Sequence, residues 1–131
     1  NCQRLGESIM GTLTSTGQAS PLATKIFKIA TANNSANANF TGATGTLFMI
    51  QIDNTANSAA SFVKLVDATS ATVGTTAPDL CFKVPASQQR TFLMPKGIAF
   101  SAGFTIFCTT SAGTAGTTSP SSAVNVICVI N

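Results

Sequence analysis

The sequence predicts an all-β protein: a single antiparallel β-sandwich, of jelly-roll or Ig-like type, with about eight strands and an extended N-terminal arm. The main observation is the stretch from Ser61 to Cys108, where short apolar runs alternate with turns rich in Ala, Thr, Ser, Gly and Pro. No stretch carries the 3.6-residue period with caps that indicates a helix of any length. A chain of 131 residues suits one domain. We expect an arm over residues 1–20 and the sandwich domain over residues 21–131.

The first 20 residues form a polar segment, rich in Gly and Thr, without a sustained helical or strand period. Such a segment is either disordered or an arm that becomes ordered against a neighbour. The segment LATKIFKIAT (22–31) then predicts the first strand. The residues at 32–45 are rich in Asn, Gly and Ser and predict a long loop, which Phe40 anchors to the core.

The most apolar strand is predicted at TLFMIQID (46–53), and SFVKLVDA (61–68) is expected to be its hairpin partner. Strict alternation places Phe48, Ile50 and Ile52 on one face of the first strand and Leu47 and Met49 on the other. A strand that is apolar on both faces is covered on both faces. In the second strand, Val63 and Leu65 share one face while Phe62, Lys64 and Val66 share the other, with Asp67 at the strand end.

The remaining runs predict further strands, separated by turns. PDLCFKVP (78–85) has Leu80, Phe82 and Val84 inward and Lys83 outward, and prolines bracket it at ends where a missing donor is tolerated. The low-complexity residues 111–123 predict a surface loop. In the closing strand, Ile127 and Val129 face away from Val124, Val126, Cys128 and Ile130, so this strand too is apolar on both sides. The other predicted strands are 90–95, 97–102 and 103–110.

Charged residues are scarce, at 8% of the chain, while 44% of residues are hydrophobic and the net charge is +3. A typical soluble domain carries about 25% charged residues. The low charge favours a surface that other subunits cover, over the alternative of a compact surface of hydroxyls and amides. No run reaches the ~18 apolar residues of a membrane helix, and no signal peptide is visible at the chain start.

The four cysteines stand at 2, 81, 108 and 128, with no C-x-x-C pair and no histidine, so a common zinc site is not expected. Cys108 and Cys128 lie in the last two strands and are a candidate disulfide. The alternative, two buried reduced thiols that pack as small hydrophobes, is favoured. Cys2 is the candidate for an intermolecular bridge.

The chain contains few side chains that could act in catalysis. Without histidine there is no Ser-His-Asp or Cys-His system, and no phosphate-binding glycine motif is present. Asp53, Asp67 and Asp79 could face each other as a glycosidase pair or a calcium site, but Asp at strand ends ordinarily caps turns. The bases are dispersed and Trp and Tyr are absent, which disfavours nucleic-acid binding. We therefore expect no enzyme activity, no cofactor and no metal.

The central block resembles small β-sandwich proteins encoded among the structural genes of tailed bacteriophages. The resemblance covers roughly the last 75 residues, and the order and spacing of its motifs carry it. The motifs are FVKLVD (62–67), TVGTTAPDL (72–80), KVPA (83–86) and GIAFSAGFTI (97–106), followed by a Thr/Ala/Gly loop.

The resemblance implies a non-enzymatic virion structural protein, most concretely a capsid decoration (cement) protein on the particle exterior, assembled in the host cytoplasm. Its partners would be further copies of itself, as a homo-oligomer such as a trimer, and the major capsid protein or other virion subunits. Nucleic acid, membranes and small-molecule substrates are not expected. The alternatives are a tail, fibre or adhesin-like host-binding module, and a fibre subunit whose arm adds a strand to a neighbour. The residues expected at the assembly interface are Leu5, Ile9, Met10, Leu13, Leu47, Met49, Ile127 and Val129.

Overall fold

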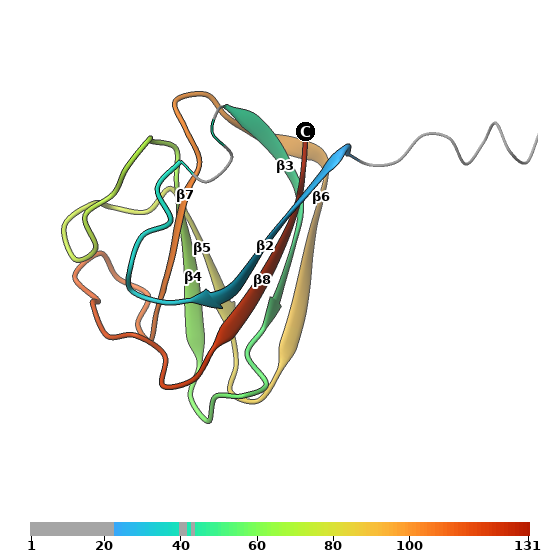
Figure 1. The fold of residues 1–131 in the computed structure, drawn as a ribbon. Coiled ribbons are helices and arrows are strands. Elements are labelled where there is room, and N and C mark those ends of the chain that lie inside the picture. Colours follow the sequence, from blue (N-terminus) through green and yellow to red (C-terminus); the bar gives the residue numbers. More distant parts are fainter. Residues whose placement is uncertain (1–22, 40–41, 43) are drawn as a thin grey trace, which may run out of the picture.

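The structure is a computed structural model that describes residues 23–39, 42 and 44–131. These residues form seven strands in two antiparallel sheets and contain no helix. The larger sheet has the order β2 (Lys25–Ala32), β8 (Val124–Ile130), β3 (Gly45–Asp53), β6 (Gln89–Phe100). The smaller sheet has the order β5 (Leu80–Val84), β4 (Ser61–Val66), β7 (Thr105–Thr109). Figure 1 shows the two sheets as two layers that face each other.

One hydrophobic core lies between the sheets. Both sheets contribute to it, for example Ile50 and Val126 from the larger sheet and Val63 and Ile106 from the smaller one, all at most 1% exposed. The side chains alternate along each strand, so every second residue of β4, β7 and β8 enters this layer. The core contains no charged side chain among the residues that the structure describes, and it is closed at one side by the rings of Phe82 and Phe92, whose centroids are 4.8 Å apart.

The all-β prediction is confirmed, but two predicted connections are wrong. The segments 46–53 and 61–68 do not form a hairpin, because β3 pairs with β6 and β8 whereas β4 pairs with β5 and β7. The residues between them cross from one sheet to the other. The segments 90–95 and 97–102 are a single strand, β6, which tolerates Pro95 because it is an edge strand.

A bulge in β3 also reverses the predicted face of one site residue. Against β8, Leu47 pairs with Ile130 and Met49 with Val129, so Phe48 is the extra residue of β3. On the other side of β3, Phe48 alone stands opposite residues 94–97 of β6. This irregularity shifts the alternation by one residue, so Leu47 enters the core with Ile50 and is fully buried. Gly97 has a φ of +77° within the bulge and lies so close to the Phe48 ring that a Cβ would collide with it.

The segment after β2 leaves the larger sheet and runs along the outer edge of β7. The backbone N–H of Ile106 donates to the carbonyl of Asn37 (3.2 Å), and the N–H of Asn37 donates back (2.8 Å). The N–H of Cys108 donates to the carbonyl of Asn33 (2.7 Å). Residues 33–39 therefore pair with the edge of the smaller sheet that β7 forms. The described residues include no helix that could cross a membrane.

Candidate assembly interface

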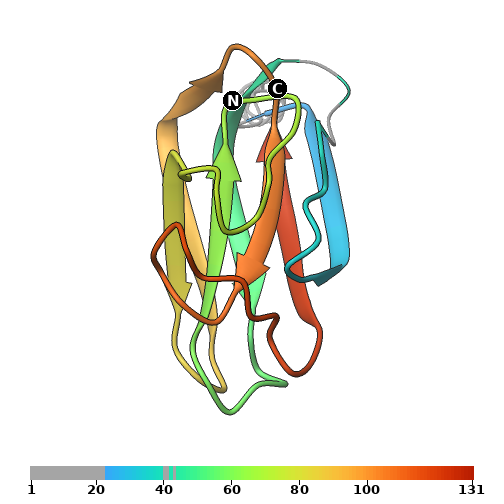
Figure 2. The ribbon, with the colours of Figure 1, turned by 90° about the vertical axis from the view of Figure 1, so that its left-hand side faces the viewer.

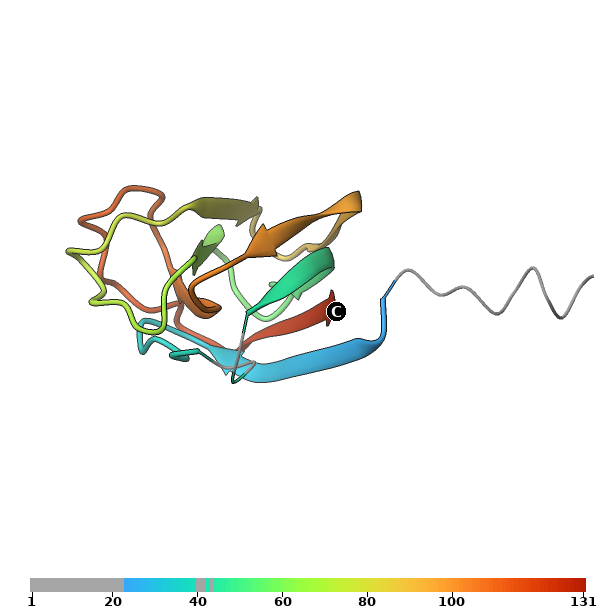
Figure 3. The same cartoon turned by 90° about the horizontal axis from the view of Figure 1, so that it is seen from above.

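The two sheets differ in what covers their outer sides. The covered face, as we call it, is the outer side of β4 and β7 in the smaller sheet and carries Phe62, Lys64, Val66, Thr105, Phe107 and Thr109. On β5, at the edge of the same side, Cys81 and Lys83 remain exposed. On the covered face, Lys64 and Thr109 are 0% exposed and Phe107 is 2% exposed. Figure 2 shows the segment after β7, drawn orange to red, crossing in front of this sheet, and Figure 3 shows the loops projecting beyond it on the side away from the larger sheet.

The loops over the covered face are held by their own contacts. Lys64 Nζ donates to the carbonyl of Gly113 (2.8 Å) and lies 5.8 Å from the centroid of the Phe107 ring. Asn34 Nδ2 donates to the carbonyl of Thr117 (2.8 Å), which ties the segment after β2 to the same loop. Gly74, with a φ of +92°, leaves room for the Thr117 methyl, so the two long loops pack against each other.

Burial lowers the pKa of Lys64 from its ordinary value, because the charged ammonium has lost most of its water. The carbonyl and the aromatic face replace only part of that hydration. We interpret Lys64 as a structural residue that supports the loops, because it lies beneath them and is not accessible to solvent.

A network of buried asparagines fixes the opposite ends of these loops. Asn54 is 0% exposed, and its Nδ2 donates to the carbonyls of Ala59, Val84 and Pro85. Its Oδ1 accepts hydrogen bonds from Ser61 Oγ and Asn57 Nδ2 (2.7 and 2.9 Å). Asn57 also accepts from the backbone N–H of Ser122 (2.8 Å) and donates to its carbonyl (3.1 Å). The turn after β3 is thereby joined to the loop that covers the smaller sheet.

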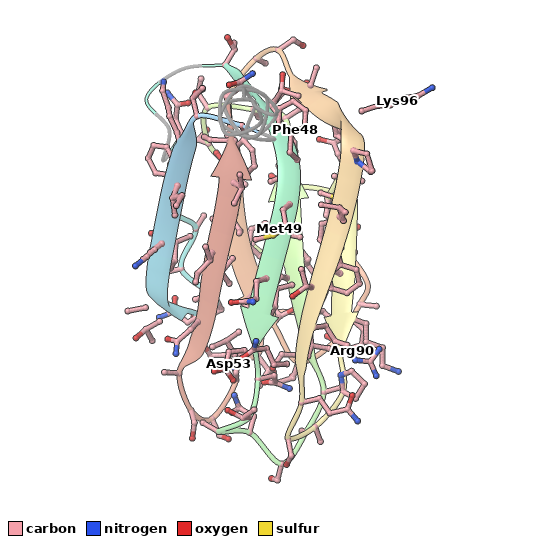
Figure 4. The ribbon with its side chains drawn as sticks, turned by 90° about the vertical axis from the view of Figure 1, so that its right-hand side faces the viewer. Phe48, Met49, Asp53, Arg90 and Lys96 are labelled. Atoms are coloured by element: carbon pink, nitrogen blue, oxygen red, sulfur yellow. The ribbon has the colours of Figure 1, made fainter. Side chains whose placement is uncertain are left out.

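The outer side of the larger sheet, here called the open face, has no such cover from the described part of the chain. In its register Ile26 pairs with Val129, Val129 with Met49, and Met49 with Leu93. These four side chains, the apolar row, therefore cross all four strands at one level on one face. Ile26 is 64% exposed and Leu93 is 60% exposed, which marks them as the exposed large hydrophobic residues of the described chain. Figure 4 views this face, with Met49 near the middle of the sheet.

The open face becomes polar away from the apolar row. The next level consists of Lys28, Ile127, Gln51 and Thr91, and the level after it includes Asn125, Asp53 and Gln89. A shallow hollow lies between β2 and β8 on this polar side and is lined by Lys28, Ile29, Ala30, Asn125, Val126 and Ile127. The face thus has an apolar strip with a polar margin, which is the composition of a protein–protein contact.

The strand-end aspartates cap turns, as the ordinary interpretation of the sequence predicts. Asp67 Oδ1 accepts from the backbone N–H of Ala102 (2.8 Å) and Gly103 (3.3 Å), and these bonds lower its pKa. Asp53 Oδ1 accepts from the N–H and hydroxyl of Thr55, which lowers its pKa too. Asp79 accepts from the N–H of Asp67 (2.7 Å). Within the described residues no group of His, Cys, Asp or Glu side chains is arranged to hold a metal ion.

The structure divides the predicted interface residues into three groups. Met49, Ile127 and Val129 lie together on the open face. Leu47 is wrong as an interface residue, because the bulge places it in the core at 0% exposure. The remaining four, Leu5, Ile9, Met10 and Leu13, lie outside the described residues. Cys2 and Phe40, which the sequence also singled out, lie outside them too.

The candidate disulfide is not formed, since Cys108 and Cys128 are free thiols. One is on β7 and the other on β8, in opposite sheets, and both are 0% exposed. Burial raises the pKa of each thiol to about 12, so both remain protonated at neutral pH. They fill core volume as small hydrophobic side chains.

The two most exposed members of the apolar row, Ile26 and Leu93, were not among the predicted contacts. Each stands directly beside a phenylalanine, Ile26 before Phe27 and Leu93 after Phe92. The local sequence therefore does not say which neighbour points outward. Their positions at the two edges of the larger sheet become evident only from the strand register.

Comparison with known proteins gives no relative for this chain: no family model matches it, and neither the curated proteins nor the solved structures contain a match.

Proposed function

We propose that this chain is a non-enzymatic virion structural protein, and most concretely a capsid decoration protein that stabilises a shell from the outside. The open face is the observation that carries the proposal. It presents an apolar row across four strands, with a polar margin that includes Lys28 and Asp53, while loops of the chain itself cover β4 and β7 of the other sheet. A subunit that fills a contact between neighbours needs such a surface.

We further infer that the two sheets form a β-sandwich of the jelly-roll type. In a jelly roll of eight strands counted along the chain, the first, eighth, third and sixth form one sheet, and the second, seventh, fourth and fifth form the other. Counting residues 33–39 as the second strand gives both orders here. Jelly rolls are frequent in viral capsid domains, and this supports the virion role by analogy of fold.

The bacteriophage assignment rests on the motif series between residues 62 and 106. In the structure these motifs supply most of β4, both ends of β5, the last four residues of β6 and the first two residues of β7, with parts of the turns that join them. They build the framework and not the open face, because Val63, Val84 and Ile106 of these motifs lie in the core. The resemblance therefore supports the class of protein, and the open face supports its role in assembly.

The test is to locate the chain in native particles. Virions from the encoding phage are purified and decorated with antibody against the chain, then imaged by electron microscopy. The expected result is label at regular positions on the capsid exterior. Label confined to the tail would favour a tail or fibre module over a decoration protein. Purified virions that lack the chain altogether would refute a structural role.

A matched pair of variants connects the role to the open face. Met49→Lys places a charge in the centre of the apolar row, and Ala112→Lys places the same charge on the exposed loop of the opposite side. Added to particles that have been stripped of the chain, Ala112→Lys should rebind like the natural chain, whereas Met49→Lys should not. Equal rebinding by both variants would remove the open face from the proposal.

A further inference from the structure

We propose that the open face binds a second copy of this chain, with the two larger sheets packed face to face about a twofold axis parallel to their strands. The inference names a partner for the surface on which the proposed function rests, but its test needs only the isolated protein. Four features support it. The apolar row lies at one level across the strands, and the rows of two copies match under this symmetry. Lys28 and Asp53, the charged residues on the levels described above, do not meet their own copies, and the face is large enough for a specific contact.

The apolar row is level because the Cα partners run in one line, from Ile26 through Val129 and Met49 to Leu93. An axis parallel to the strands, midway between β8 and β3, reverses the strand order and keeps each level in register. It therefore places Ile26 opposite Leu93 of the second copy, and Val129 opposite Met49. The two most exposed apolar side chains of the described chain cover each other in both halves of the dimer.

The same operation gives acceptable partners to the polar levels. Lys28 lies opposite Thr91 of the second copy, and Asp53 lies opposite Asn125, because β2 faces β6 and β3 faces β8. Neither charge meets its own copy. Both lie off the apolar row, where an interface keeps access to water. A twofold contact thus buries the apolar row without placing like charges together.

The face is also large enough for a specific contact. Four strands at about 4.8 Å, each with about seven residues at about 3.3 Å, give a face of about 440 Å² in projection. Two such faces give about 900 Å² before the relief of the side chains is counted, close to the roughly 1,000 Å² that a specific interface exceeds. Aligned sheets pack about 10 Å apart, so the side chains of the two rows would interdigitate.

The first experiment measures the mass of the full-length chain by sedimentation or light scattering over a range of concentrations. The expected result is a concentration-dependent dimer. Met49→Lys should raise the dissociation constant at least 100-fold, because the axis brings the two new ammonium groups together, and Leu93→Lys should raise it about 10-fold. Ala112→Lys, on the opposite side, should leave it unchanged. Leu93 is exposed in the single chain, so its variant is expected to fold.

The second experiment tests the orientation by cross-linking. In a background of Cys2→Ser and Cys81→Ser, with the buried thiols of Cys108 and Cys128 retained, one protein carries Ile26→Cys and another carries Leu93→Cys. A bismaleimide spanning about 10 Å should join the two in a mixture, since facing sheets lie at about that distance. The Ile26→Cys protein alone should not cross-link, because its two thiols would lie at opposite edges of the contact, about 17 Å apart.

Each alternative result overturns the inference. A monomer at all concentrations removes the self-contact, and particle labelling would still test the proposed function. A trimer, or cross-linking of Ile26→Cys with itself, contradicts the twofold arrangement. A dimer that survives Met49→Lys but dissociates when residues 1–20 are deleted assigns the contact to the N-terminal segment. Conversely, a dimer with the expected cross-link in a chain absent from virions would refute the proposed function and leave this inference standing.

Discussion

The covered face and the open face are outer sides of two sheets that share one core, yet their side chains differ in exposure to solvent. On the covered face, even a lysine is fully buried, because the loops after β2, β4 and β7 lie over it and bond to one another. On the open face, two large apolar residues remain more than half exposed. Long connections therefore cover β4 and β7 from within the chain, whereas the described chain leaves the open face uncovered, and we propose that a partner covers it.

The same truncation on the two faces should give the largest difference. Phe107→Ala removes a ring that is 2% exposed beneath the loops, and the cavity should lower the free energy of unfolding by about 3 kcal/mol. Leu93→Ala on the open face should change it by less than about 0.5 kcal/mol. Denaturant unfolding at a concentration where the chain is monomeric measures both. Equal losses would mean that the two faces are not distinct in the isolated chain.

The asparagine network offers a second contrast. Asn57→Ala removes the hydrogen bonds that join the turn after β3 to Ser121 and Ser122, and should cost about 2 kcal/mol of unfolding free energy. Asn125→Ala changes the same residue type where it is exposed on the open face, and should cost less than about 0.5 kcal/mol. Hydrogen exchange in residues 111–123 should quicken only in the first variant. An unchanged exchange rate there would show that the asparagine network does not hold the loop at 111–123 in place.

The sequence predicted the faces of strands well where the alternation is unbroken. In β4, β5 and β8 the inward and outward residues follow the period of two, so Met49's partners Ile127 and Val129 were placed correctly by pattern alone. The prediction failed for Leu47, because the bulge at Phe48 depends on residues 94–97 of a strand that is distant in sequence. A pattern read along one strand contains no information on such a partner.

The connection between β3 and β4 was missed for a related reason. Turn residues at 54–60 indicate a reversal of the chain, but a reversal within one sheet and a crossing between two sheets use the same residue types. The crossing is held by the buried side chain of Asn54, which donates to the carbonyls of Val84 and Pro85 at the end of β5, in the other sheet, as well as to Ala59 of its own loop. The exposure of Ile26 and Leu93 likewise follows from strand order and not from hydropathy.

The smallest expected effect concerns Lys64, and its sign tests how the covered face tolerates a buried charge. Its pKa is lowered in the folded chain by loss of hydration, so below that pKa the unfolded chain holds the proton more favourably. The unfavourable contribution is then present at neutral pH and declines as the pH rises toward 10.5, the ordinary value. Lys64→Met keeps the length of the side chain and removes the ammonium. We expect it to raise the free energy of unfolding by about 1 kcal/mol at pH 7.

The pH dependence of this difference separates charge from packing. Urea unfolding of both proteins between pH 7 and pH 10 should show the advantage of Lys64→Met shrinking with rising pH. The thiols of Cys108 and Cys128 lower stability above pH 9 in both proteins alike, because each thiol has a pKa of about 12 in the folded chain against 9.0 ordinarily. That common effect cancels in the difference.

Lys28→Met, on the open face, is the matched control, and its free energy of unfolding should stay within about 0.5 kcal/mol of that of the natural chain. A Lys64→Met protein less stable than the natural chain at pH 7 would mean that the bond to Gly113 and the Phe107 ring outweigh the lost hydration, so that the ammonium itself holds the loop in place.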